Sequence, residues 1–166
     1  MTSTAERMRA WAGPAILTYG FRPFFFGGAL WAALAMALWV AMLSGHIALP
    51  TAFDQVSWHA HAFLYGYLGA VIAGFLLTAV PNWTGRLPIV GWPLGALAAL
   101  WLAGRVAVMV SAGLPPLTVA AVDLAWELVR ELAPGRMISH RVPLDEAGGA
   151  YELIAHQREQ VLQVVL

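Results

Sequence analysis

The sequence of 166 residues contains no cysteine, no lysine and few charged side chains. Without cysteine it offers no disulfide, zinc finger, iron–sulfur cluster or thiol nucleophile, which leaves histidine, carboxylate, methionine and tyrosine as possible metal ligands. All nine cations are arginine and nine acidic residues balance them, so no basic field argues for nucleic acid. Charged residues make up 11% of the chain, against roughly 25% in soluble domains.

Charge is missing from long continuous stretches. No charged side chain lies between Arg22 and Asp54 or between Asp54 and Arg86, and Arg105 is the one charge between Arg86 and Asp123. Each stretch supplies the roughly 20 apolar residues that a helix needs to cross a hydrocarbon core of about 30 Å. With 60% hydrophobic residues and a mean hydropathy of +0.70, the composition predicts a polytopic helical membrane protein. The partner that it predicts is the lipid bilayer.

We predict an all-α membrane fold with three transmembrane helices, a partial fourth, and a small soluble α/β-like tail. The expected segments are a cytoplasmic N-terminus (1–23), three spans (24–43, 57–80 and 92–110), a partial fourth (117–125) and the tail (126–166). The first run is longer than the roughly 7–15 apolar residues of a signal peptide, so we expect it to be retained. Within the tail, Ile138–Val142 and Val161–Leu166 favour strands and Leu144–His156 favours a helix.

Small residues recur at every fourth position in each predicted span. This spacing lets helix backbones approach closely in lipid, although alanine is also simply common here. The stripes are Ala29, Ala33, Ala37 and Ala41; Ala62, Gly66, Ala70 and Gly74; and Gly95, Ala99, Ala103 and Ala107. Three tryptophans lie deeper in the spans and are predicted to be packing residues: Trp31, Trp39 and Trp101.

The arginines predict an orientation. Three precede the first span and Arg86 lies between the second and third, whereas the loop between the first and second carries only Asp54. Because positively charged loops favour the cytoplasm, we expect the N-terminus and the Arg86 loop to lie there. Asp54 and the start of the second span then face outward.

His59 and His61 open the second span. Histidines at membrane depth are functional candidates, and imidazole suits haem iron and copper. On a regular helix, positions i and i+2 differ by about 200°, so the two rings cannot chelate one ion. Either they serve two centres, or one alone is a ligand, or the helix begins after them. The alternative is a pair of interfacial histidines bonded to water and loop carbonyls.

Arg105 is the single charge within the third span. Arginine at the centre of a bilayer costs about 2.5–3.5 kcal/mol on insertion scales, so such a residue usually faces the bundle and finds an anion. We place it in the outer half, on the same side as the histidines, where a haem propionate or another anion would satisfy it. The alternative is snorkelling to the outer interface.

Four segments together resemble the NnrS family. They are 20–25 (GFRPFF), 58–61 (WHAH), 73–85 (AGFLLTAVPNWTG) and 101–105 (WLAGR), and the likeness runs from about Tyr19 to Ala125. The long segment ending in Asn-Trp-Thr-Gly is the most specific. The resemblance implies a multi-pass protein of the bacterial inner membrane that contains haem and copper and is linked to nitric oxide metabolism, nitrosative stress and denitrification. His59 and His61 match the histidine motif, and Arg105 is a plausible partner for an anionic group of the cofactor.

This sequence departs from the pattern of the NnrS family in two ways. The family motif commonly continues with glutamate, where this chain has Ala62. The predicted spans are also fewer than the family has, so the missing spans or self-association would have to complete the bundle.

The tail resembles the end of zinc-type alcohol dehydrogenases. The likeness rests on 138–147 (ISHRVPLDEA), 150–153 (AYEL) and 163–166 (QVVL). These segments carry none of that family's zinc ligands and no Gly-rich nucleotide loop, so we expect no dehydrogenase activity and assign no catalytic residue. A non-functional fusion fragment, or a small structural or transport subunit without cofactor, remain the alternatives to a haem and copper protein.

Overall fold

The computed structural model describes residues 10–84, 88–135, 140–141 and 164–165. Its first part contains a short helix and one long helix, η1 (Ala15–Leu17) and α2 (Phe21–Leu43). A second long helix follows in three consecutive segments, α3 (Gln55–His61), η2 (Ala62–Leu68) and α4 (Gly69–Thr84). The remaining helices are α5 (Trp92–Met109), η3 (Ser111–Gly113) and α6 (Pro116–Gly135).

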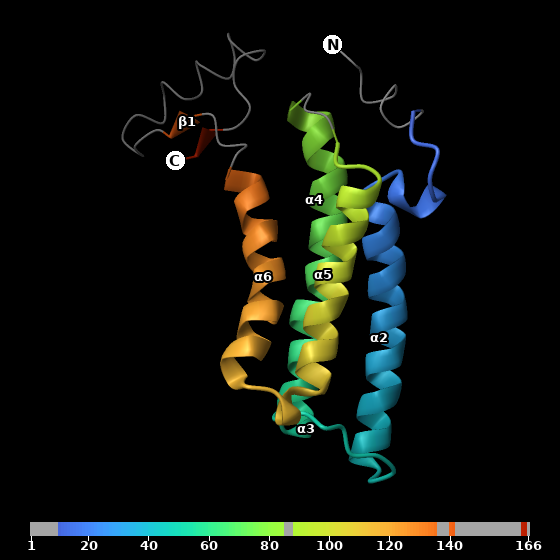
Figure 1. Ribbon diagram of the computed structural model, residues 1–166, viewed down its shortest axis with the longest axis vertical. Coiled ribbons are helices and arrows are strands. Elements are labelled where there is room, and N and C mark those ends of the chain that lie inside the picture. The colour runs from blue at the N-terminus through green and yellow to red at the C-terminus, as the bar shows by residue number, and fades with distance from the viewer. Residues whose placement is uncertain (1–9, 85–87, 136–139, 142–163, 166) are drawn as a thin grey trace.

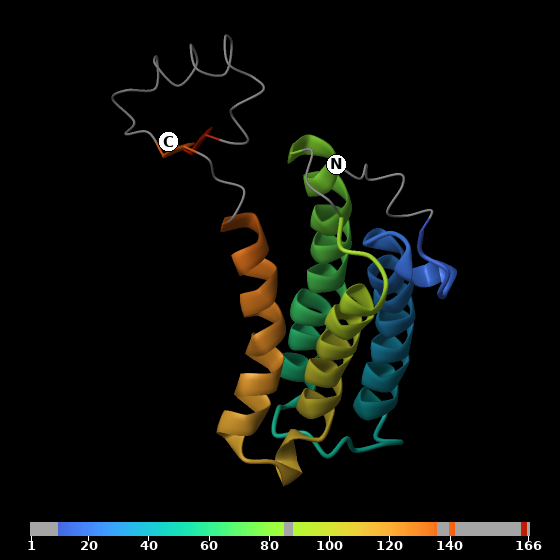
Figure 2. The same ribbon diagram turned by 45° about the horizontal axis from the view of Figure 1, so that its top comes forward.

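The long helices stand side by side as a bundle (Figure 1). The start of α2, the end of α4 and the start of α5 share one end of it, and α3, the end of α5 and the start of α6 share the other. The same packing is visible after the bundle is turned (Figure 2), with α6 lying along α5. Consecutive helices are therefore antiparallel, as short connections between spans require.

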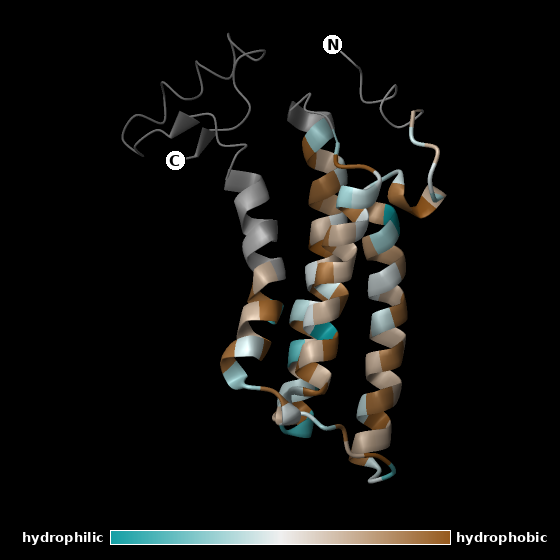
Figure 3. Cartoon of the chain, viewed as in Figure 1, coloured by the Kyte–Doolittle hydropathy of each residue, from teal (hydrophilic) through white to brown (hydrophobic). Residues whose placement is uncertain are grey.

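Three helices are long and apolar enough to cross a membrane. They are Phe21–Leu43, Gln55–Pro81 and Trp92–Met109. They confirm the predicted spans to within a few residues at each end. Figure 3 shows hydrophobic positions over most of their length. Large apolar side chains are also exposed on their outer faces, including Leu34, Val40 and Leu64. Such continuous apolar surface is unusual on a soluble monomer and is compatible with lipid.

The fourth helix is longer than its apolar part. Its apolar stretch is Pro116–Ala125, close to the predicted partial span, but α6 continues as one helix to Gly135. The predicted boundary at Trp126 thus lies inside a helix, because Glu, Arg and Leu are good helix formers whether or not they are buried. Beyond it, β1 (His140–Arg141) and β2 (Val164–Val165) pair in parallel, within the two segments predicted as strands. The predicted helix at 144–156 lies outside the described residues.

The small-residue stripes differ in how they are used. The stripe of the second span is buried along its whole length, as predicted. In α2 the prediction is wrong: Ala29, Ala33 and Ala37 are exposed, and the inward face instead carries Phe24 and Trp31. Of the third-span stripe only Ala107 is fully buried. An alanine face meets lipid as easily as protein, so periodicity alone does not say which face turns inward.

The middle of the second long helix is a π-helix, η2, whose turns are wider than α-helical turns. Two buried indoles from different helices hold it: Trp31 Nε1 of α2 donates to Ala62 O at 2.8 Å, and Trp101 Nε1 of α5 donates to Gly66 O at 3.0 Å. In lipid, irregular backbone persists where neighbouring helices satisfy its polar groups. Trp31 and Trp101, predicted as packing residues, are therefore also hydrogen-bond donors to η2.

Candidate functional site

The helix that carries the two histidines begins before them. Asp54 is the N-cap of α3, and its Oδ1 accepts hydrogen bonds from the backbone N–H groups of Val56 and Ser57, both at 3.0 Å. The hydrogen bonds to Ser57 lower the pKa of the Asp54 carboxyl below its ordinary value of 3.8. Since His59 and His61 both lie in regular helix, one of the sequence alternatives is excluded, and their rings lie on different faces as the spacing predicts.

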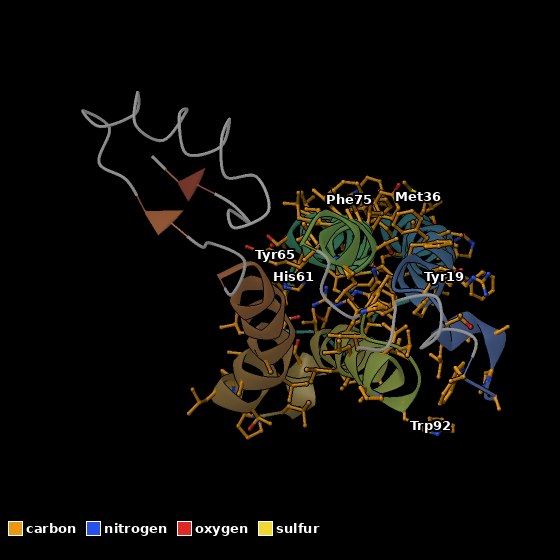
Figure 4. All side chains as sticks on the ribbon, turned by 90° about the horizontal axis from the view of Figure 1, so that it is seen from above. Tyr19, Met36, His61, Tyr65, Phe75 and Trp92 are labelled. Atoms are coloured by element: carbon orange, nitrogen blue, oxygen red, sulfur yellow. The ribbon has the colours of Figure 1, made fainter. Side chains whose placement is uncertain are left out.

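His61 faces α6. Its Nε2 lies 2.9 Å from Oδ2 of Asp123, and its ring stacks on Tyr65 at 4.8 Å between centroids, with Phe53 on another side at 5.6 Å. Figure 4, which looks down the bundle, shows His61 and Tyr65 together beside α6. The carboxylate holds the imidazole in one orientation and fixes which of its nitrogens remains for other partners.

The same carboxylate meets Arg105. Nη2 of Arg105 donates to Oδ1 of Asp123, and the Arg105 side chain is 1% exposed. Gly104 makes room for this contact, since a Cβ there would lie 3.1 Å from Oδ1 of Asp123. The prediction that Arg105 faces the bundle and finds an anion is confirmed, and snorkelling is excluded by its burial. The anion in this structure is a side chain of α6.

Asp123 is the residue that sequence reasoning missed as a site residue. The α5–η3–α6 segment is a helical hairpin, and Arg105 and Asp123 each lie nine positions from Leu114, near its turn. Equal distances from the turn of an antiparallel pair place two side chains at the same depth. This spacing of one cation and one carboxylate was the available signal.

A cavity of about 460 Å³ lies next to these groups. His61, Tyr65 and Asp123 line it together with Phe53, Ser111 and the apolar face of α6. Ser111 is itself buried, and its Oγ accepts a hydrogen bond from the backbone N–H of Ala52 at 2.8 Å. The cavity therefore combines apolar walls with a few convergent polar groups, the usual composition of small-molecule sites.

His59 lies in a different environment, against α2. Its ring stacks on Trp39 with centroids 3.8 Å apart and planes at 15°, and Phe63 lies at 4.7 Å. Nδ1 of His59 and Nε1 of Trp39 are both buried and have no hydrogen-bond partner among the described residues. Buried polar nitrogens without partners are uncommon and call for an explanation. His59 is therefore oriented by ring stacking and has no hydrogen bond to a residue that the structure describes.

The described residues bring together only part of the predicted constellation. His61 and Arg105 meet at Asp123, whereas His59 lies apart from both. No group of three or more histidine or carboxylate side chains that could hold a metal ion occurs in the described part of the chain. His46, by contrast, is an exposed loop residue whose Nδ1 lies 2.7 Å from Oγ of Ser44.

Three apolar spans, a helical hairpin closed by a buried ion pair, and a π-helix that directly follows the two histidines define a multi-pass helical membrane protein. A family comparison then places it more narrowly. The chain belongs to the NnrS protein family, whose model matches residues 15–142. The match extends past the predicted limit at Ala125 and includes the whole of α6. No curated protein and no solved structure matches the chain, so the dehydrogenase likeness of the tail stays a prediction.

Proposed function

We propose that this chain is part of a haem- and copper-containing protein of the nitric oxide response, seated in the bacterial inner membrane. Family membership, three apolar helices and the Trp58–His61 motif on a membrane helix support the proposal. The ends of the bundle support an orientation: the start of α2, which carries Arg22, lies at the same end as the last turn of α4 and the first turn of α5. The sequence between α4 and α5 contains Arg86, so we assign this end to the cytoplasm under the positive-inside rule.

His59 carries the haem proposal. Haem iron can be held by one imidazole, and neither ring nitrogen of His59 makes a hydrogen bond with another described residue. Its Nδ1 is buried against Trp39, which leaves Nε2 as the ligand atom, and stacking on Trp39 fixes the plane of the ring. When bound, haem would supply an iron centre able to take a diatomic ligand such as nitric oxide.

Copper fits this part of the chain less well. Its sites use several nitrogen or sulfur donors, and the described residues hold no group of three. At His61 a metal would have to bind through Nδ1, because Asp123 occupies Nε2. Such a carboxylate–histidine pair is a common arrangement around metal ligands, so His61 stays the second candidate, with further donors required from outside the described residues.

The test is haem binding by the full chain purified in detergent after expression with excess haem. We expect a Soret band that His59→Ala removes in large part and that nitric oxide shifts. His46→Ala is the matched control, because His46 is exposed in a loop. A haem-replete preparation without visible absorption, or equal loss in both variants, would refute the role of His59. Copper is measured on the same samples by elemental analysis.

A second function is supported by the His61–Asp123–Arg105 chain of contacts, which joins three helices at membrane depth. Histidine and carboxylate chains inside membranes often carry protons, so a small transport subunit without cofactor could use the same residues. It predicts a pH-driven leak in liposomes that Arg105→Leu changes. A leak of the same size in wild-type protein and in the variant would eliminate this function.

A further inference from the structure

The cavity beside His61 has no role in the haem proposal, because His59 faces α2 and not this space. Its lining comes from the loop before α3, the end of α3, η2, the end of α5, η3 and α6. Its walls combine an apolar side and a polar side, and each limits what can bind there.

The apolar side belongs to α6. Val119, Ala120 and Leu124 line the cavity, and Ala120 and Leu124 are exposed on the outer surface. In a membrane protein this side opens toward hydrocarbon. A ligand that enters here has to dissolve in the bilayer, which excludes nucleotides, sugars and other strongly hydrated molecules.

Another part of the lining is aromatic. The rings of His61 and Tyr65 are nearly parallel, with an interplanar angle of 23°, and the Phe53 ring is tilted beside them at 46° to His61. Aromatic surfaces favour planar rings in offset stacks, at centroid separations of about 4.5–7 Å. A flexible acyl chain would gain little from such a wall.

The polar groups come from several elements. Nε2 of His61 is taken by Asp123, so the imidazole can offer a ligand only its Nδ1, and Tyr65 stands beside it. Ser111 lies in η3, on another part of the lining, and its hydroxyl is anchored by Ala52 N–H and Thr51 Oγ1. The pairing of Asp123 with Arg105 keeps this buried carboxylate from repelling an electron-rich ligand.

We propose that this cavity binds the head group of a lipid-soluble quinone or quinol. A ring with oxygens at opposite ends matches an aromatic lining and polar groups that come from separate elements, and its isoprenoid tail matches the apolar side on α6. The volume of about 460 Å³ lies within the roughly 300–1,000 Å³ of small-molecule sites. The proposal concerns binding and requires neither haem nor copper.

The experiment measures binding of a short-chain ubiquinone analogue to haem-free full chain in detergent by equilibrium dialysis. Ala120→Trp fills the cavity, and Ala121→Trp places the same bulk on the neighbouring exposed position, which does not line it. We expect saturable binding that Ala120→Trp weakens at least about tenfold, equivalent to about 1.4 kcal/mol, and that Ala121→Trp leaves within about twofold.

A milder pair keeps the test informative if the tryptophan variant fails to fold. Tyr65→Phe removes a hydroxyl beside the cavity, while Tyr67→Phe does so on a residue that does not line it, and both tyrosines are partly exposed. We expect about threefold weaker binding for Tyr65→Phe alone. No saturable binding by wild type, or equal binding by both members of each pair, overturns the proposal. If the wild type binds no quinone and Ala120→Trp releases co-purified phospholipid, the proposal is also overturned, and the cavity is a phospholipid-binding site.

Discussion

Two interfaces of the bundle are built on opposite principles. Between α2 and α4 the contact depends on the close fit of small residues. Gly28 of α2 lies against Ala70 of α4. Gly74 of α4 lies against the start of α2, and a Cβ added to Gly74 would fall 2.8 Å from the Phe25 ring. Between α5 and α6 the contact centres on the buried pair of Arg105 and Asp123. A substitution that spoils the fit between α2 and α4 should lower stability in proportion to the misfit. Removing one charge between α5 and α6 leaves the other charge buried without a partner, which costs more.

The π-helix η2 lies between the two interfaces and is fastened to both. Trp31 reaches it from α2 and Trp101 reaches it from α5, so a disturbance on either side acts on the same seven-residue segment. Because η2 begins directly after His61, it links the packing of the bundle to the candidate site.

The largest effect is expected at the charged interface. Arg105→Leu or Asp123→Leu alone should lower the free energy of unfolding by about 3–5 kcal/mol, because each leaves a buried charge without its partner. The double variant should cost less than either single change. Denaturation in detergent, followed by circular dichroism, measures all three. Additive losses in the double variant would show that the pair is not coupled.

Where α2 packs against η2, a contact that also depends on shape, the expected effect is smaller. A Cβ at Gly66 would lie 2.3 Å from Nε1 of Trp31, so Gly66→Ala should displace a buried, hydrogen-bonded indole and cost about 2 kcal/mol. Gly113→Ala is the control, since nothing lies within 4 Å of the added carbon. The same denaturation assay applies, and equal midpoints for the two variants would contradict the packing explanation.

The two braces of η2 can be compared directly. Trp31→Phe and Trp101→Phe each remove one indole N–H and leave a carbonyl of η2 without that donor, so each should cost about 1–2 kcal/mol. Trp92→Phe, at a residue 69% exposed, should leave the midpoint nearly unchanged. Hydrogen exchange of the backbone of η2 should increase in the first two variants only. Unchanged exchange in both would mean that the indoles do not hold the segment.

The smallest effect concerns the helix start outside the spans. The pKa of Asp54 is lowered in the folded protein, so its contribution is complete above the ordinary value of 3.8 and is lost as the pH falls through the lowered value. Asp54→Ala should slightly lower the melting temperature at neutral pH, and by progressively less as the pH falls below 3.8. A variant whose deficit persists undiminished in acid would show that the charge of Asp54 is not the cause.

The three spans could be predicted because length and apolarity alone decide whether a helix crosses a bilayer. The divergence of His59 and His61 followed from helix geometry, and the depth of Arg105 from counting along its span. The partner of Arg105 needed one more step, the equal spacing of Arg105 and Asp123 about Leu114. Composition concealed it, since Asp123 read as the end of an apolar run.

The π-helix could not be predicted from local sequence. Its stability depends on indole donors that arrive from α2 and α5, and Gly66 only makes room for them. The inward face of α2 could not be predicted from the sequence either, because alanine and aromatic faces can both be exposed to lipid. Contacts between helices determine the π-helix and the inward face of α2, whereas the thickness of the bilayer determines the length and apolarity of the spans.

The hairpin of α5 and α6 has a consequence for how the protein is made. Alone, α6 would bring a carboxylate into the bilayer and α5 a guanidinium, and each would be penalised at the translocon. Because a short connection joins the two helices, Arg105 and Asp123 could enter the bilayer as an ion pair and not as two separate charges. The order of synthesis would then matter, because Arg105 in the third span has this partner only after α6 has been synthesised and has packed beside α5.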